Sequence, residues 1–169
     1  MHVNHTFPIF INEDSEILIL GSFPSVKSRE QMFYYAHPQN RFFKVLSILF
    51  NEEYSLDINK RKSMLKKHKI ALYDVIEECD IIGSADSTIT NIKPIDLKAI
   101  FERYPNIKVI GITGNKAGSL FDKYLLDKVG NRKVVKLPST SPANAKMKID
   151  TLVEKFKELI YWYSFYILI

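Results

Sequence analysis

The sequence predicts an α/β fold: a single-domain, three-layer α/β/α sandwich around a central, mainly parallel sheet of four strands. Four short apolar runs have the length of buried strands, and segments with helical spacing of apolar residues separate them. Strands that alternate with helices in one small domain favour a parallel sheet covered on both faces. Size is the third observation, because 169 residues, 46% of them hydrophobic, suffice for one core.

Each apolar run ends at a turn signal or a polar residue. The predicted strands are residues 16–20 (EILIL), 70–73 (IALY), 108–112 (KVIGI) and 132–137 (RKVVKL). Helices are predicted over residues 41–50, 96–103 and 115–126, and from about residue 149. The chain has no internal repeat, low-complexity tract or Gly/Ser linker, so we expect one domain over residues 1–169.

Charge and cysteine content restrict the partner and the compartment. Lysine and arginine total 24 against 19 acidic residues, and the net charge of +5 favours a polyanionic partner without requiring one. The lone Cys79 excludes an intramolecular disulfide, an all-cysteine zinc site and a cysteine-ligated iron–sulfur cluster. We expect a reducing cytoplasm, and the first ten residues lack the pattern of a signal peptide.

The chain ends in an apolar segment, residues 159–169. It falls well short of the roughly 20 residues that span a bilayer as a helix. We therefore expect no membrane partner, and we interpret the segment as a helix end that is buried or covered by a partner.

Two polar loops follow the first predicted strand. They are residues 21–25 (GSFPS) and 34–43 (YYAHPQNRFF), which combine hydroxyls, amides, an imidazole and aromatic rings. Because ligands of parallel sheets bind beyond the carboxyl ends of the strands, these loops predict a binding pocket. The alternative is a simple turn and helix start, with Asn40 as the N-cap of the following helix.

The sequence resembles the hypoxanthine-DNA (deoxyinosine) glycosylases, a branch of the uracil-DNA glycosylase superfamily. The resemblance rests on residues 21–46, 70–89 and 137–145, and GSFPS followed by YYAHPQNRF is its most specific part. It implies a uracil-DNA glycosylase-like fold and an enzyme that flips a deaminated base, above all hypoxanthine and also uracil, and hydrolyses its N-glycosidic bond. It further implies double- or single-stranded DNA as the partner, a monomer, no metal or other cofactor, and a cytoplasmic, nucleoid-associated location.

The resemblance assigns the polar catalytic role to Asn40, and His37 is the second catalytic candidate. Relatives in the superfamily often carry Asp, Asn or Glu in the first loop to orient water, but this chain has Phe23 there. An asparagine is neither a base nor a nucleophile, so Asn40 acts by positioning water or the leaving group through its amide. His37 donates a hydrogen bond to the departing purine or to a phosphate, and its alternative role is a structural imidazole beside Pro38.

Three residues are expected to contact the extruded base: Phe23, Ser22 and Asp74. Phe23 offers a stacking face, although ordinary core packing is its alternative role. The Asp74 carboxylate accepts from N1–H of hypoxanthine or N3–H of uracil, and helix capping is its alternative role. Ile95 stands where the family leads us to expect a polar residue, which bears on base selectivity. Residues 84–87 fit a family pattern that we interpret as loop-ordering.

A hydroxyl-rich segment after the last predicted strand resembles the superfamily's second loop, which presses on the DNA backbone and enters the duplex. Its predicted DNA-binding residues are Ser139, Thr140, Ser141, Pro142, Ala143 and Asn144. Residues 111–118 match neither a Walker nor a dinucleotide fingerprint, so we predict a tight strand-to-helix turn with Lys116 near the DNA. The lysine-rich runs 60–69 and 146–148 are solvated faces or borders of the DNA path.

Two other functions remain open at this stage. One is a glycosylase of the same fold that prefers uracil, or uracil or thymine mispaired with guanine. The other is a catalytically silent nucleic-acid-binding module that retains the fold.

Overall fold

A four-stranded parallel sheet with the strand order β3-β2-β6-β7 forms the centre of the computed structural model, which describes residues 1–82 and 86–167. Its strands are β2 (Ile17–Gly21), β3 (Ile70–Asp74), β6 (Val109–Thr113) and β7 (Lys133–Leu137). β2 and β6 are buried along their whole length, as strands covered on both faces are. The predicted sheet is therefore confirmed, with strand ends shifted by about one residue.

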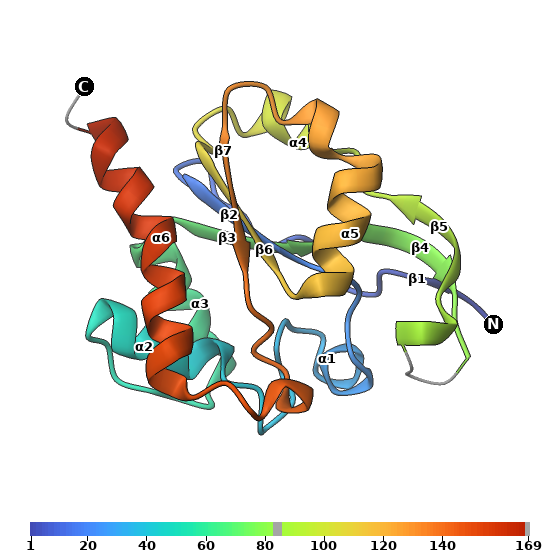
Figure 1. Cartoon of the computed structure of the whole chain (residues 1–169), viewed down its shortest axis with the longest axis horizontal. Helices are drawn as coiled ribbons and strands as arrows, with labels where there is room; N and C mark the ends of the chain where they lie inside the picture. Colours follow the sequence, from blue (N-terminus) through green and yellow to red (C-terminus); the bar gives the residue numbers. More distant parts are fainter. Residues whose placement is uncertain (83–85, 168–169) are drawn as a thin grey trace.

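Helices cover both faces of this sheet, which gives the predicted three layers (Figure 1). One face carries α2 (Phe42–Phe50), α3 (Ile58–Lys67) and α6 (Ile149–Ile167). The other carries α4 (Leu97–Arg103) and α5 (Asn115–Tyr124), and a 3₁₀ turn, Leu126–Lys128, continues past the end of α5. The lysines of the 60–69 run mostly lie on the exposed side of α3.

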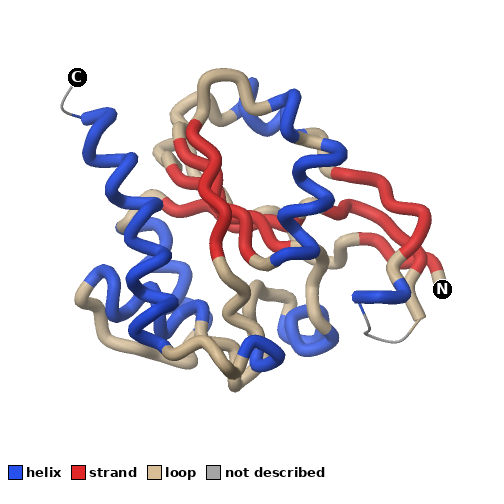
Figure 2. The backbone as a smooth tube through the Cα atoms, viewed as in Figure 1, coloured by secondary structure: helices blue, strands red, loops and turns tan. Residues whose placement is uncertain are grey.

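The protein also contains a second, antiparallel sheet (Figure 2), which was not predicted from the sequence. Its order is β1-β4-β5, formed by β1 (His2–Asn4), β4 (Ile76–Asp80) and β5 (Thr90–Pro94). These strands are short and largely polar, and the pairing of β4 with β5 is interrupted by register shifts. The sheet matters for the site because β4 begins two residues after β3 ends, and β1 attaches the amino terminus to β4.

Helix α6 contains residues 159–167 of the apolar carboxyl-terminal segment. Leu159 is buried against the sheet, and a Cβ on Gly111 would lie 2.8 Å from Leu159 Cδ2, so the glycine permits this close approach. Tyr161 is exposed, and the side chains of 162–169 lie outside those described. Within the described part of the chain, no helix has both the length and the apolarity needed to cross a membrane.

Candidate active site

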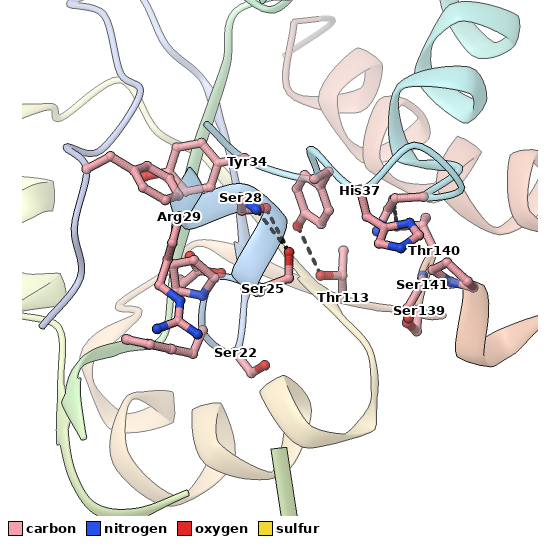
Figure 3. Close-up of a pocket in the computed structure, with 18 of the residues that line it drawn as sticks. Ser22, Ser25, Ser28, Arg29, Tyr34, His37, Thr113, Ser139, Thr140 and Ser141 are labelled. Carbon is pink, nitrogen blue, oxygen red and sulfur yellow. Dashed lines mark hydrogen bonds between the residues drawn. The ribbon is translucent and has the colours of Figure 1, made fainter. Parts of the chain in front are cut away.

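A pocket of about 350 Å³ opens at the carboxyl ends of the four parallel strands. Its lining comes from residues 21–25, 28–29, 34–35, 37, 40, 74, 113 and 139–142, with Phe7 and Ile81 (Figure 3). Both polar loops predicted from the sequence contribute to it, together with the second loop after β7. This position agrees with the rule that ligands of parallel sheets bind beyond their carboxyl ends.

A short helix follows the first loop and leads the chain back to the pocket. α1 (Val26–Gln31) begins at Ser25, whose hydroxyl accepts from the Ser28 backbone N–H at 3.1 Å, and ends at Met32 in the left-handed region. The chain then turns again at Tyr35, with φ of 52°. The Tyr35 ring stacks on Phe42 with centroids 3.8 Å apart, and its hydroxyl lies 3.1 Å from Thr113 Oγ1, so this segment is fixed to the end of β6.

Asn40 joins the two polar loops through its side-chain carbonyl. Oδ1 accepts from the Phe42 backbone N–H and from the Thr140 hydroxyl, both at 2.9 Å. The first bond is the cap-like contact considered as an alternative, although Arg41 is the residue that precedes α2. Two donors occupy the lone pairs of Oδ1, so the remaining hydrogen-bonding group of this amide is the donor Nδ2.

The orientation of His37 is set by its own loop. The Gln39 backbone N–H donates to His37 Nδ1 at 3.1 Å, so in the neutral ring the proton lies on Nε2. The half-buried ring lines the pocket, and Figure 3 places it beside Ser139, Thr140 and Ser141. His37 therefore offers a second N–H donor on the same side as Asn40.

Asp74 ends β3 on the other side of the pocket and is buried. Its Oδ2 lies 2.8 Å from His5 Nε2, and it caps no helix, which removes the alternative role considered for it. Its Oδ1 faces Gly21, where a Cβ would lie 2.6 Å from that oxygen. Among the described residues, Oδ1 has no hydrogen-bond partner, so it is a vacant acceptor on the pocket wall.

Phe23 and Ser22 line the pocket as predicted. Phe23 is 8% exposed and also belongs to the core beneath α4 and α5, so the core packing considered as its alternative role is present, and stacking on the base stays a prediction. Ile95 is buried in the same core and does not line the pocket, which explains its apolar character. Ser84 and Ala85 lie outside the described residues, as does the side chain of Asp86, and therefore so does most of the expected 84–87 pattern.

In the second loop, Ser139 and Ser141 each accept a hydrogen bond from a nearby backbone N–H, so their O–H groups stay free to donate. Thr140 differs: it is 2% exposed and its hydroxyl donates to Asn40, so its backbone N–H is the group that remains for the expected phosphate contact. Its role is to hold Asn40.

The rest of the second loop forms a short 3₁₀ turn, Pro142–Asn144. Asn144 donates through Nδ2 to the Ser139 carbonyl, Pro142 lines the pocket and Ala143 is exposed. Lys116 is exposed in the first turn of α5. Gly114, the residue before α5, has a φ of 86° and lies against Ser139, which confirms the predicted tight strand-to-helix turn.

Sequence reasoning missed several groups of the pocket and its wall. His5 precedes the first polar loop, and Arg29 lies between the two polar loops with a half-buried side chain whose Nε has no partner among the described residues. Burial raises the pKa of Tyr34, Tyr35 and Tyr73, and the charge of Asp74 acts in the same direction, so these phenols stay neutral. Adjacent tyrosines in a polar loop were the one available signal for Tyr34 and Tyr35.

The comparisons agree with this architecture. The model of the uracil DNA glycosylase superfamily matches residues 8–161, and the chain belongs to that superfamily. The Hypoxanthine DNA glycosylase of Methanosarcina acetivorans is 34% identical over 145 residues, which are 85% of this chain and 90% of that protein. The Hypoxanthine DNA glycosylase of Methanosarcina barkeri is 34% identical over 113 residues, 66% and 72% of the two chains.

A solution NMR structure from Methanosarcina acetivorans, described as a uracil DNA glycosylase, has a similar fold. It superimposes with a TM-score of 0.77 at 32% identity, and the match covers 92% of this chain and 94% of that one. The family and fold expected from the resemblance are confirmed.

Proposed function

We propose that this protein is a monofunctional DNA glycosylase that hydrolyses the N-glycosidic bond of hypoxanthine in DNA. The proposal rests on the hydrogen-bonding groups of the pocket. Asp74 Oδ1 is a vacant acceptor at the β3 side, and Asn40 Nδ2 and His37 Nε2 are donors at the β7 side. β3 and β7 are the outer strands of the sheet, so the acceptor and the donors stand toward opposite ends of the pocket.

The base is read at the Asp74 end. Hypoxanthine presents N1–H, a donor that matches the vacant carboxylate oxygen, whereas N1 of adenine is an acceptor and is repelled by it. The ring of Phe23 provides the apolar face on which the flipped base stacks. Uracil presents N3–H to the same oxygen, so it is an additional substrate of this proposal.

The bond is broken at the Asn40 end. Cleavage of an N-glycoside leaves positive charge on the sugar and negative charge on the departing base, so fixed donors near the base lower the barrier. The amide of Asn40 is held rigidly by Phe42 and Thr140, which keeps Nδ2 in place for the base or the attacking water. His37 Nε2–H is the second donor for the departing purine or a phosphate.

Water is the nucleophile in this proposal. A glycosylase that also cleaves the strand attacks with an amine, and none of the lysines in the described part of the chain lines the pocket. Ser139 and Ser141 line the pocket, and Lys116 is exposed in the first turn of α5; these three residues are the proposed contacts to the DNA backbone. All these groups come from one chain, which supports a monomer, and we place the enzyme with the nucleoid in the cytoplasm.

Incubation of the purified protein with duplexes that contain one deoxyinosine, one deoxyuridine or no lesion tests the proposal. Alkali-labile breaks at the lesion, together with free hypoxanthine detected by mass spectrometry, are the expected result. Breaks that appear without alkali would contradict the monofunctional assignment. Binding of DNA with no base release from either lesion would favour the silent module instead.

A further inference from the structure

His5 makes a buried contact with Asp74 behind the pocket wall. His5 Nε2 lies 2.8 Å from Asp74 Oδ2, and His5 Nδ1 lies 2.8 Å from the Phe7 carbonyl oxygen. The two side chains are only 2% and 8% exposed. His5 itself does not line the pocket, so it reaches the substrate only through Asp74.

The two bonds of the imidazole determine how many protons the pair holds. The Phe7 carbonyl only accepts, so Nδ1 must carry a proton. A second proton must then lie between Nε2 and Oδ2, because a bare nitrogen lone pair facing a carboxylate at 2.8 Å is repulsive. The pair therefore binds one proton more than a neutral histidine next to a carboxylate, and as a whole it carries no net charge.

The amino-terminal strand holds His5 in this position. The His5 backbone N–H donates to the Glu77 carbonyl at 2.8 Å, which continues the pairing of β1 with β4. The imidazole packs against Phe7 and Tyr73, with ring centroids 4.7 and 4.6 Å away, and more distantly against Tyr34 and Phe23. This aromatic enclosure keeps water away from the pair, which strengthens its electrostatic interaction.

We propose that His5 is a positioning residue that keeps Asp74 ionised and directs Oδ1 into the pocket as the acceptor for the N1–H of the base. This inference rests on the proposed function, because it concerns the same base-reading carboxylate. With His5 protonated, Asp74 accepts a hydrogen bond from hypoxanthine. Without a cation beside it, the buried carboxyl takes up a proton more readily, and its O–H then opposes the N1–H of the substrate.

Few other groups near the pair change charge around neutral pH. The hydroxyls of Tyr34, Tyr35 and Tyr73 have pKa values raised by burial. The Glu77 carboxylate, on β4, is paired with Lys93 at 3.0 Å.

Two cations or potential cations remain on the walls of the pocket, Arg29 on α1 and His37 in the second polar loop. Arg29 keeps its charge throughout this range. His37 lies toward the other end of the pocket and is unchanged in the variants below.

The test compares His5→Leu and His5→Gln with the wild type. Leucine removes both bonds, whereas the amide of glutamine retains a donor for Asp74 that does not titrate near neutral pH. His2→Leu is the matched control, because His2 lies on β1, three residues before His5, and pairs with Asp80 at the surface. Single-turnover excision from a deoxyinosine duplex is measured between pH 6 and pH 9, with the melting temperature of each variant.

His5→Leu should be about 10- to 100-fold slower than the wild type near neutral pH. This deficit should shrink as the pH rises, because a higher pH opposes proton uptake by the buried carboxyl that the variant leaves without a cation. His5→Gln should retain most of the activity without a pH-dependent deficit, and His2→Leu should follow the wild type.

Parallel pH profiles for His5→Leu and wild type would overturn the inference. If His5→Leu does not fold, His5→Asn takes its place, because its amide is too short to reach Asp74: slower excision by a folded His5→Asn than by His5→Gln supports the assignment, and equal rates refute it. The failure of the proposed function is a separate outcome, since the wild type itself would then release no hypoxanthine at any pH.

Discussion

At the scale of single residues, Gly21 lies against Asp74, the carboxylate that we propose reads the base. A methyl group there would lie 2.6 Å from Asp74 Oδ1, so Gly21→Ala must displace that oxygen or the strand end. We expect at least a 10-fold loss of hypoxanthine excision, with a stability cost of about 1–3 kcal/mol. Single-turnover kinetics and urea denaturation measure the two effects.

Gly118→Ala is the matched control for this substitution. Gly118 lies inside α5, where the nearest atom to an added methyl is Lys136 Nζ at 3.5 Å, so alanine fits and favours the helix. If Gly21→Ala releases hypoxanthine at the same rate as Gly118→Ala, excision does not require Asp74 Oδ1 in its observed position, and the proposed base reading is wrong.

The sequence identified most of the residues around the pocket but not how they pair. Asn40, His37, Phe23, Ser22 and Asp74 all line it. The Asn40–Thr140 bond joins residues 100 positions apart, and the His5–Asp74 bond joins residues 69 apart. No local pattern encodes such contacts, which depend on which strands become neighbours. The bond from Thr140 to Asn40 was therefore missed, and His5 was overlooked.

At the scale of elements, the second loop and the turn into α6 form the proposed DNA-binding edge. Lys146 and Lys148 are exposed there, and the neighbouring carbonyls of Asn144 and Met147 accept from the Arg41 guanidinium, which anchors the turn to the start of α2. Replacing both lysines by alanine should weaken duplex binding. It should also reduce the slope of log K against log salt by about 0.9 for each phosphate that the variant no longer neutralises.

The control pair for this measurement is Lys66→Ala with Lys108→Ala. Both lysines are exposed near the amino ends of β3 and β6, whereas the pocket lies at the carboxyl ends of these strands. Fluorescence anisotropy at several salt concentrations gives the slopes. Equal slopes for both double variants and the wild type would place the DNA on another surface.

Elements with a strong apolar signal were predictable, and the others were not. The fully buried β2 and β6 are continuous apolar runs in the sequence, and the apolar residues of α2 recur at helical spacing. β1 and β5 expose most of their residues, so their sequences resemble loops. Their pairing with β4 is a tertiary effect, and it is this small sheet that brings His5 to Asp74.

At the scale of the whole molecule, we predict that excision needs no metal. The proposed mechanism uses only N–H and O–H donors and one carboxylate, and the described residues contain no group of three or more His, Cys, Asp or Glu side chains suited to a metal ion. Activity should therefore persist after exhaustive EDTA treatment. Loss of excision that added zinc restores would contradict this prediction.

The central claim is that the rigidly held amide of Asn40 accelerates base release, and single-turnover cleavage of a deoxyinosine duplex by Asn40→Ala tests it most directly. Loss of one fixed polar group in such a site typically slows the reaction by on the order of 10²- to 10³-fold, whereas a missing cap-like bond costs only about 1 kcal/mol of stability. Melting and duplex-binding measurements on the same variant separate the two effects. We predict a folded variant that binds duplex DNA but releases hypoxanthine at least 100-fold more slowly, as expected from that magnitude. A variant that melts several degrees lower yet cuts at nearly the wild-type rate would contradict the account.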